Sequence, residues 1–258
     1  MGQYYYFATS LPVIRIGEPV ELSFQDFITL AKQNLSASDE QMLQRVRTYY
    51  DIRNIRALWK EEDFERYGNL DRLSLEEALI SRIGLPEYVY NFLELYDSSQ
   101  RCLDHFPQLI SWYFHEESQK NGFLEQYLNF ERELRLILAT FRAKKLGRDV
   151  VAELQYEPPS DEIVAQIIAQ KDAKSYEPPY RYSDLKPIFD KYSDQPLDLH
   201  LALNEYRFHK ISDMIGVDMF SEERILSYMV RLIIAEKWQE LDQQKGIQII
   251  DQIVKEAS

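Results

Sequence analysis

Histidine and its acidic neighbours are the first side chains to consider for metal binding or proton transfer. The chain has four histidines, and they lie in different segments. Only Glu205 and His209 are predicted to share a helix face, because they are four residues apart, and Asp213 follows one turn later. The sequence has neither HExxH nor the Glu-x-x-His pairs that build di-iron sites in helical bundles. We interpret the three residues as a surface hydrogen-bonding group, and a metal or acid–base site is the alternative.

The sequence gives little support for nucleophilic catalysis or for nucleotide binding. Cys102 has no neighbouring histidine that would activate its thiol, and the G-x-S-x-G nucleophile elbow does not occur in the sequence. Phosphate-binding loops need closely spaced glycines, and the sequence contains neither G-x-x-x-x-G-K nor G-x-G-x-x-G. We predict a protein that is not an enzyme, with no catalytic residue, no cofactor and no metal.

The remaining candidate binding site is a group of basic residues on an otherwise acidic chain. The group lies near the end of a predicted helix and consists of Arg142, Lys144, Lys145 and Arg148. Cations in the last turn of a helix commonly complement the helix dipole while facing water. They could also form a docking site, for which an acidic or helical protein is the best partner. The residues alone leave both interpretations open.

The helix that would carry this basic group is predicted over residues 123–147. Its large apolar residues recur at spacings of four and three, which places them along one seam. The seam consists of Phe123, Tyr127, Phe130, Leu134, Ile137 and Phe141. Leu124, Leu128 and Leu138 widen the apolar face, so we expect neighbours on two sides, and Gly147 is expected to end the helix. At about 1.5 Å per residue the helix would be on the order of 35 Å long.

Capping signals predict further helices before this one. Ser23 with Asp26, and Ser36 with Asp39, have the spacing of a capping box. The helix that begins after Ser36 is expected to continue until Gly68.

The first residues and the glycine count bear on the fold class. The aromatic cluster at residues 4–12 ends in proline and predicts a short extended segment whose rings pack under later helices. Eight glycines in 258 residues are too few for the turns of a sheet architecture. The predicted class is therefore all-α, with many helices arranged in two lobes.

Paired prolines suggest where the lobes meet. One modest helix is expected between two proline pairs, at Tyr156-Glu-Pro-Pro159 and Tyr176-Glu-Pro-Pro179. Paired prolines cannot continue a helix and stiffen an extended connection. We predict an N-terminal lobe over residues 1–151, a linker over 152–182 and a C-terminal lobe over 183–258.

The charge balance restricts the partners. The 43 acidic and 30 basic residues give a formal charge of −13, which repels nucleic-acid phosphates and anionic lipids. A single cysteine forms no disulfide within the chain, and the first twelve residues lack the basic flank and apolar core of an export signal. Apolar runs fall far short of the roughly 20 residues that cross a membrane. We expect a cytoplasmic protein that does not bind nucleic acid.

A weak internal repeat is visible around the long helices. Aligning Asn54 with Glu133 also aligns Gly68 with Gly147, each fourteen residues further on. A third echo runs from residue 236 to Gly246. The sequence therefore predicts pseudo-repeated helical units, with coincidence as the alternative.

Three stretches together resemble a bacterial family of uncharacterised proteins encoded beside V-type ATPase subunits in chlamydiae, spirochaetes and related bacteria. They are YYYFATSLP, YYDIRNIRALW and ELRLILATFRAKKLG. More distantly, the pattern Asp51-x-x-Asn54-Ile55-Arg56 is similar to the acidic-x-x-Asn-Leu-Arg run in the C subunit of V-type ATPases, which is the d subunit in eukaryotes. That family is an all-helical funnel of three pseudo-repeats, which seats the central stalk on the membrane rotor ring.

The resemblance implies a non-catalytic subunit that couples the central stalk to the membrane ring during proton or other ion transport. Its partners would be stalk and ring subunits, and it would be cytoplasmic and peripheral to the inner membrane through the complex. The interface residues expected from this resemblance are Arg56, Arg135, Arg142, Lys144 and Lys145. One alternative is a transient assembly or regulatory adaptor for the ATPase. Another is a small-molecule or metal-dependent enzyme that uses Glu205, His209 and Asp213.

Overall fold

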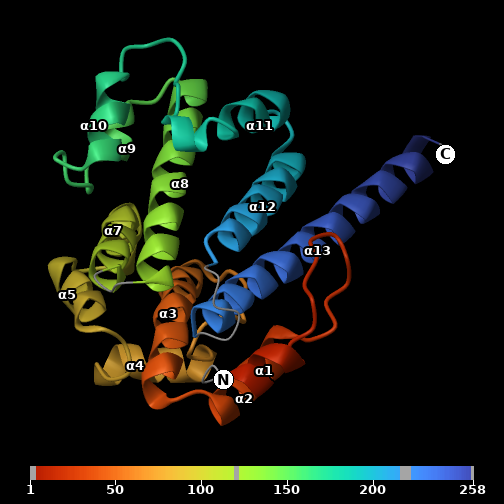
Figure 1. Ribbon diagram of the computed structural model, residues 1–258. Helices are drawn as coiled ribbons and strands as arrows, with labels where there is room; N and C mark the ends of the chain where they lie inside the picture. Colours follow the sequence, from red (N-terminus) through yellow and green to blue (C-terminus); the bar gives the residue numbers. More distant parts are fainter. Residues whose placement is uncertain (1–3, 119–121, 216–221, 257–258) are drawn as a thin grey trace. The chain divides into compact units, whose positions relative to one another are not determined.

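The computed structural model describes the backbone of residues 4–118, 122–215 and 222–256 (Figure 1). Within these ranges the chain forms thirteen α-helices and one 3-10 turn, and no strand, so the all-α class is confirmed. The elements are α1 (Tyr5–Ser10), α2 (Phe24–Asn34), α3 (Ala37–Lys60), α4 (Arg72–Ser81), α5 (Glu87–Leu95), α6 (Ser99–Asp104), α7 (Phe106–Glu117), α8 (Phe123–Leu146), α9 (Val150–Glu153), α10 (Glu162–Ala169), η1 (Tyr180–Tyr182), α11 (Leu185–Tyr192), α12 (Pro196–Asp213) and α13 (Glu222–Glu256).

The chain divides into two compact units, which group the sequence differently from the predicted lobes. Unit 1 combines residues 1–35 with residues 177–258, and unit 2 comprises residues 36–176. In unit 1 the backbone N–H of Phe24 donates to the buried carboxylate of Glu236 at 2.8 Å, and Phe27 stacks on Tyr228 with ring centroids 5.4 Å apart. These contacts join α2 to α13 across more than 200 residues, so residues 1–35 belong with the C-terminal part.

Most of the segment expected as a linker is part of unit 2. In α10 the side chains of Ile163, Val164 and Ile167 are buried, and α10 contacts α8. The carboxylate of Asp161 accepts hydrogen bonds from the N–H groups of Ile163 and Val164, so it caps α10. The predicted helix between the paired prolines is therefore present, and it packs within unit 2.

The aromatic residues near the start form α1 instead of the expected extended segment. The hydroxyl of Thr9 donates to the carbonyl of Tyr5 at 2.8 Å, and that of Ser10 donates to the carbonyl of Phe7 at 2.8 Å. The single helical turn buries Phe7, whose ring stacks on Phe27 at 6.2 Å. The expectation that a ring from this segment packs against a later helix is confirmed, although the backbone prediction was wrong.

Both predicted serine N-caps are confirmed, but the helix after the second ends earlier than expected. Ser23 accepts from the N–H of Asp26, and Ser36 accepts from the N–H of Asp39. The helix α3 stops at Lys60, because Glu61 adopts the left-handed conformation with a φ of 56°. Gly68 lies in the loop that follows.

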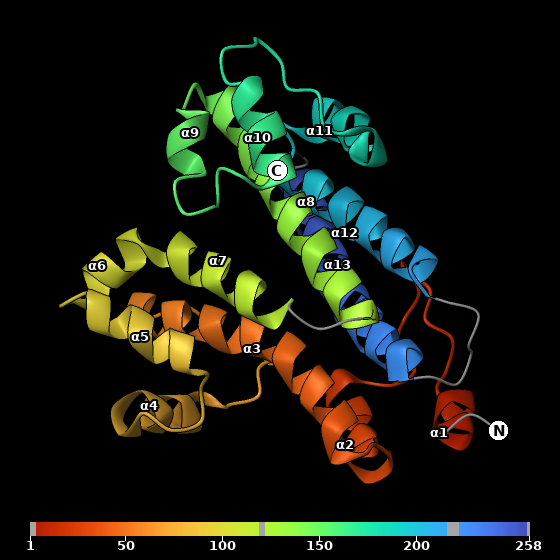
Figure 2. The same cartoon turned by 60° about the vertical axis from the view of Figure 1, so that its left-hand side comes forward.

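The long helix α8 agrees with its prediction at both ends. It begins at Phe123 and ends at Leu146, and its predicted seam is buried. It contacts α7, α9 and α10, so it has neighbours on more than one side (Figure 2). Every helix in the described parts of the chain is either too short or too polar to cross a membrane.

Candidate protein-binding site at the end of α8

The end of α8 is shaped by Gly147. This residue has a φ of 64°, in the left-handed region where glycine carries no side-chain penalty. Its N–H donates to the carbonyl of Lys144, and the N–H of Arg148 donates to the carbonyl of Ala143 at 2.9 Å. These bonds satisfy carbonyls of the last turn and reverse the chain. The short helix α9 then starts at once, with Asp149 accepting from the N–H of Val151 at 2.8 Å.

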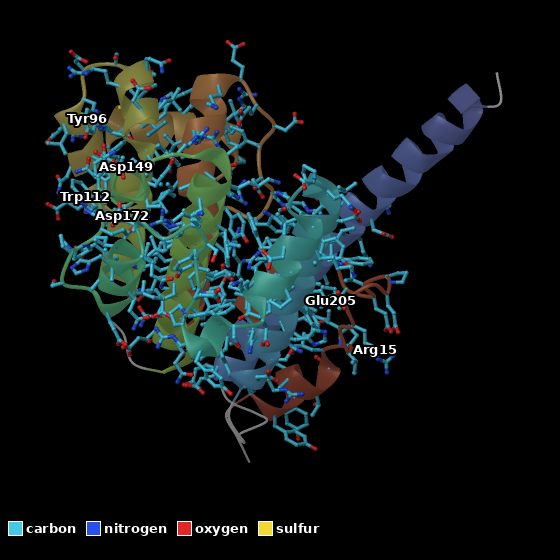
Figure 3. All side chains as sticks on the ribbon, turned by 90° about the horizontal axis from the view of Figure 1, so that it is seen from above. Arg15, Tyr96, Trp112, Asp149, Asp172 and Glu205 are labelled. Carbon is cyan, nitrogen blue, oxygen red and sulfur yellow. The ribbon has the colours of Figure 1, made fainter. Side chains whose placement is uncertain are left out.

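A shallow depression of about 610 Å³ lies beside this turn. It is lined by Gly147, Arg148, Asp149, Val150, Val151, Lys171 and Asp172. Asp149 and Asp172 are labelled in Figure 3. The residues that line the depression include both acidic and basic side chains. It is open and polar, which suits contact with another macromolecule better than enclosure of a small apolar ligand.

Exposed cations and apolar side chains occur on the last turn of α8 and on the residues that follow it, two of which, Arg148 and Val151, line the depression. Arg142, Lys145 and Arg148 are exposed on the last turn of α8 and just beyond it, as are Leu146 and Val151. We call these five residues the α8-end surface. Arg148 and Glu153 form an ion pair of 3.5 Å in which both side chains are solvated, so it holds Arg148 only weakly.

Lys144, predicted as an interface residue, is engaged within unit 2. Its ammonium donates to the carbonyl of Gln170 at 2.8 Å, to that of Ala173 at 2.6 Å, and to that of Lys171. A cation that caps the carbonyls at the end of α10 is stabilised by the helix dipole. The contact fixes Lys171, and with it one wall of the depression, against α8.

Arg135, also predicted at the interface, binds Glu157 instead. The buried carboxylate of Glu157 accepts from Arg135 and from Arg132, whose Nε and Nη2 lie 3.0 and 2.8 Å away. Arg132 also donates to Asp161 at 2.9 Å. Burial opposes the charge of Arg132, but its attraction to Glu157 and Asp161 outweighs that penalty, so its pKa is raised. The four residues tie the segment before α10 to the middle of α8.

Arg56, the fifth predicted interface residue, lies on a different element. It is half-buried on α3, and Figures 1 and 2 show α3 on the side of α7, away from α9 and α10. The structure thus gathers Arg142 and Lys145 with Arg148, and it does not bring Arg56 to them.

The motif that contains Arg56 holds a loop in place. The side-chain amide of Asn54 donates to the carbonyl of Glu65 at 2.9 Å, and its oxygen accepts from the N–H of Glu65 at 2.8 Å. Asp51 accepts from the N–H of Leu70 at 3.0 Å and from the amide of Asn69 at 2.8 Å. Asp51 and Asn54 therefore have structural roles in the loop after α3.

The two glycines aligned by the predicted repeat, and the glycine of its third echo, have different environments. A Cβ atom at Gly68 would lie 2.5 Å from Oδ1 of Asp51, so this position needs a residue without a side chain. At Gly147 such an atom would meet nothing within 4 Å, and the requirement there is conformational. Gly246 lies inside α13, which continues to Glu256.

The predicted polar trio lies along one helix of unit 1. Glu205, His209 and Asp213 are all exposed on α12, and Figure 3 labels Glu205. In the described parts of the chain, no group of three or more histidine, cysteine or acidic side chains is arranged to hold a metal ion. Cys102 is buried, and burial, with a smaller contribution from Asp97, raises the pKa of its thiol. A thiol with a raised pKa is a poor nucleophile at neutral pH.

The ion-pair cluster that positions the site was not predicted from the sequence. It consists of Arg132, Glu157 and Asp161. Glu157 is 25 residues from Arg132, and its one local peculiarity is an acidic side chain between Tyr156 and two prolines. Arg132 and Arg135 are three residues apart, which places both on one helix face. That pair of arginines is the signal that could have suggested a buried acidic partner.

Comparison with known proteins places the chain among proteins of similar length. A family model described as "Protein of unknown function (DUF2764)" matches residues 1–257. A protein of Chlamydia muridarum and one of Chlamydia trachomatis, each described as "Uncharacterized protein", are 28% identical over 262 residues, covering 99% of this chain and 98% of theirs. A Chlamydia pneumoniae protein with the same description is 30% identical over 263 residues, with the same coverage. No solved structure matches the chain.

Proposed function

The chain belongs to the DUF2764 family, and we propose that it acts as a non-catalytic subunit of a bacterial V-type ATPase. In this role it would be a socket or spacer between the central stalk and the membrane rotor ring. It would transmit force through packed helices, and it would reach the membrane through its partners. We propose that the α8-end surface contacts an acidic segment of a helical stalk subunit.

The observation that carries the proposal is the concentration of exposed cations at the end of α8 on a chain with a formal charge of −13. Complementary charge mainly sets the orientation and the rate of association. Leu146 and Val151, exposed within the same surface, offer apolar area whose burial would add affinity. The surface therefore has three exposed cations and two aliphatic side chains. A helical partner with an apolar stripe flanked by acidic residues would complement both.

The rest of the support comes from the resemblance and from the fold. Two of the three resembling stretches contribute to the long helices α3 and α8, and the other supplies α1. Arg132, Arg135 and Lys144 brace α8 against the segment that carries α10. A braced surface loses little conformational freedom on binding, which favours a part that must bear load.

The test is co-purification of the full-length chain with the ATPase from its native host. We expect the unmodified chain at one copy per complex, together with stalk and ring subunits. The variant R142E/K145E/R148E should lose most of this association, because it reverses the charge of the surface. Two controls should keep it: R142K/R148K preserves the charge, and Lys32→Glu changes an exposed cation on α2.

Two outcomes would count against the proposal. Absence of the chain from an intact, active complex would remove the subunit role, and transient binding during assembly would then favour the adaptor. Unchanged association of the charge-reversed variant would show that the α8-end surface is not the contact.

A further inference from the structure

The helix α4 exposes large aliphatic side chains to solvent. Leu73 and Ile80 are 77% and 85% exposed, and Ile83, just after the helix, is 74% exposed. We call these three residues the α4 patch. The opposite side of α4 buries Leu75 and Ala78, and α4 contacts α3. Figure 2 shows α4 at the margin of unit 2. A surface helix normally turns polar residues outward, so this patch marks a contact with something else.

The spacing within the patch suits a helical partner. Leu73 and Ile80 are seven residues apart, which is about two helical turns, so they lie on nearly the same line along α4. This is the spacing at which one helix receives the apolar stripe of another. Being a helix, α4 has no unpaired backbone edge on which an extended strand could form a ladder.

The charges around the patch are unevenly neutralised. Arg72 pairs with Glu76 at 3.4 Å, and Arg82 pairs with Glu94 across to α5. Arg72 and Arg82 thus each have an acidic neighbour, and these solvated pairs add no net positive charge beside the patch.

Three carboxylates near the patch are not matched in this way. Asp71, Glu77 and Glu87 are exposed, and none of them forms an ion pair with the described residues. Glu77 lies on α4 between Leu73 and Ile80. A hydrogen bond from the N–H of Ser74 lowers the pKa of Asp71, so that group stays ionised at neutral pH. The patch is therefore apolar with an acidic centre and rim.

We propose that the α4 patch binds an amphipathic helix of a partner protein, one that presents an apolar stripe with a lysine or arginine at its centre. The cation would lie opposite Glu77. A second copy of this chain fits poorly, because a two-fold axis through the middle of α4 brings two Glu77 side chains together. An anionic lipid surface is repelled by the same carboxylates. The inference does not depend on the α8-end surface.

The probe is a pair of labelled synthetic helical peptides of about 18 residues, titrated against the full-length chain by fluorescence anisotropy. Both peptides carry leucines at heptad spacing, and they differ at one central position, lysine in one and glutamate in the other. We expect the lysine peptide to bind about fivefold more tightly. Glu77→Lys should reverse this preference, because it exchanges the sign of the central charge.

Substitution of the aliphatic residues tests the apolar contribution. Ile80→Ser should weaken binding of the lysine peptide about tenfold. Val13→Ser, which changes an aliphatic residue in unit 1 that is 76% exposed, should leave the affinity for the lysine peptide unchanged. Ile80 and Val13 are exposed, so both variants should keep the denaturation midpoint of the unmodified chain. Leu73→Ser provides a second test at the other end of the stripe.

Three results would overturn the proposal. They are the absence of saturable binding, equal affinity for the two peptides, and affinity that Ile80→Ser and Leu73→Ser leave unchanged. Sedimentation velocity of the chain alone gives a further check. A dimer that Ile80→Ser dissociates would assign the patch to a second copy, against this proposal.

Discussion

The helices α3 and α8 are both 24 residues long, and each fixes the segment that follows it by a different kind of contact. On α3, Asp51 and Asn54 bind backbone and amide groups of the loop at residues 65–70. On α8, Arg132 and Arg135 share the carboxylate of Glu157. The first arrangement consists largely of hydrogen bonds to backbone and amide groups, with one ion pair between Arg53 and Glu65 at 2.9 Å, and the second consists of ion pairs.

The two regions should therefore tolerate different substitutions. Hydrogen bonds to a backbone require close approach, so the loop after α3 passes a glycine directly over Asp51. The charged cluster on α8 has no such steric requirement. Its charges are instead largely desolvated. Removal of Glu157 leaves Arg135 without its carboxylate and leaves Arg132 with Asp161 alone.

Loss of the Glu157 charge is expected to have the largest effect. Glu157→Gln leaves Arg132 and Arg135 without their shared carboxylate, while their side chains remain only 14% and 29% exposed. We expect the free energy of unfolding to fall by about 3 kcal/mol, measured by denaturant unfolding. Glu153→Gln, at the solvated pair with Arg148, should cost less than about 0.5 kcal/mol. Equal costs for the two variants would contradict a charge-dependent brace.

The steric requirement in the α3 region is tested by Gly68→Ala. Because the new methyl group would collide with Asp51, we expect a loss of about 2 kcal/mol in the free energy of unfolding. Gly147→Ala meets no neighbour and pays only for the left-handed backbone, about 1 kcal/mol. If Gly147→Ala proves the more costly, the close approach of Gly68 is not the constraint.

A smaller effect is expected where α8 caps α10. Lys144→Met keeps most of the side-chain volume but removes the donor to three carbonyls, so we expect a loss of about 1 kcal/mol, again from denaturant unfolding. Arg142→Met changes a nearby exposed cation on α8 and should stay within about 0.5 kcal/mol of the unmodified chain. A similar loss at both positions would argue against a specific cap.

The pH dependence of stability should distinguish two carboxylates in the α3–α4 region, Asp51 and Asp71, by opposite signs. Burial raises the pKa of Asp51, with its hydrogen bonds to Leu70 and Asn69 opposing the shift. The folded state then holds this proton more tightly than the unfolded state, so this contribution to stability decreases as pH rises from 3.8 through the raised pKa. Asp51→Asn should remove that decrease from a series of unfolding measurements over pH.

Asp71 provides the opposite control. Its pKa is lowered, so its contribution is present above the ordinary aspartate value and is lost as pH falls through the lowered pKa. Asp71→Asn should flatten the acid side of the same series. Matching pH profiles for the two variants would contradict these assignments.

Local signals predicted the elements of the fold well. The seam of α8 and its terminal glycine, and the caps at Ser23 and Ser36, depend on residues within one or two turns. The end of α3 was missed because Glu61, which gives no sequence signal, adopts the left-handed conformation. The grouping of residues 1–35 with the C-terminal part was missed because a bond such as Phe24 to Glu236 joins residues 212 positions apart.

The candidate site could be predicted in part. The cations at the end of α8 were recognised from composition alone, since they stand out on an acidic chain. The contacts of Arg135 and Lys144 could not be predicted, because they depend on where Glu157 and the carbonyls after α10 lie in space. A charged side chain pairs with groups that the fold places beside it, and the spacing of residues in the sequence does not reveal which groups these are.

The burial of Cys102 has a practical consequence. It is the chain's sole cysteine, and its thiol is shielded within unit 2 and has a raised pKa. Alkylation of the native protein therefore requires α6 to open first, so the labelling rate measures how often this region exposes its interior. A cysteine introduced on the surface would react much faster, which allows a dye or spin label to be attached there without removing Cys102.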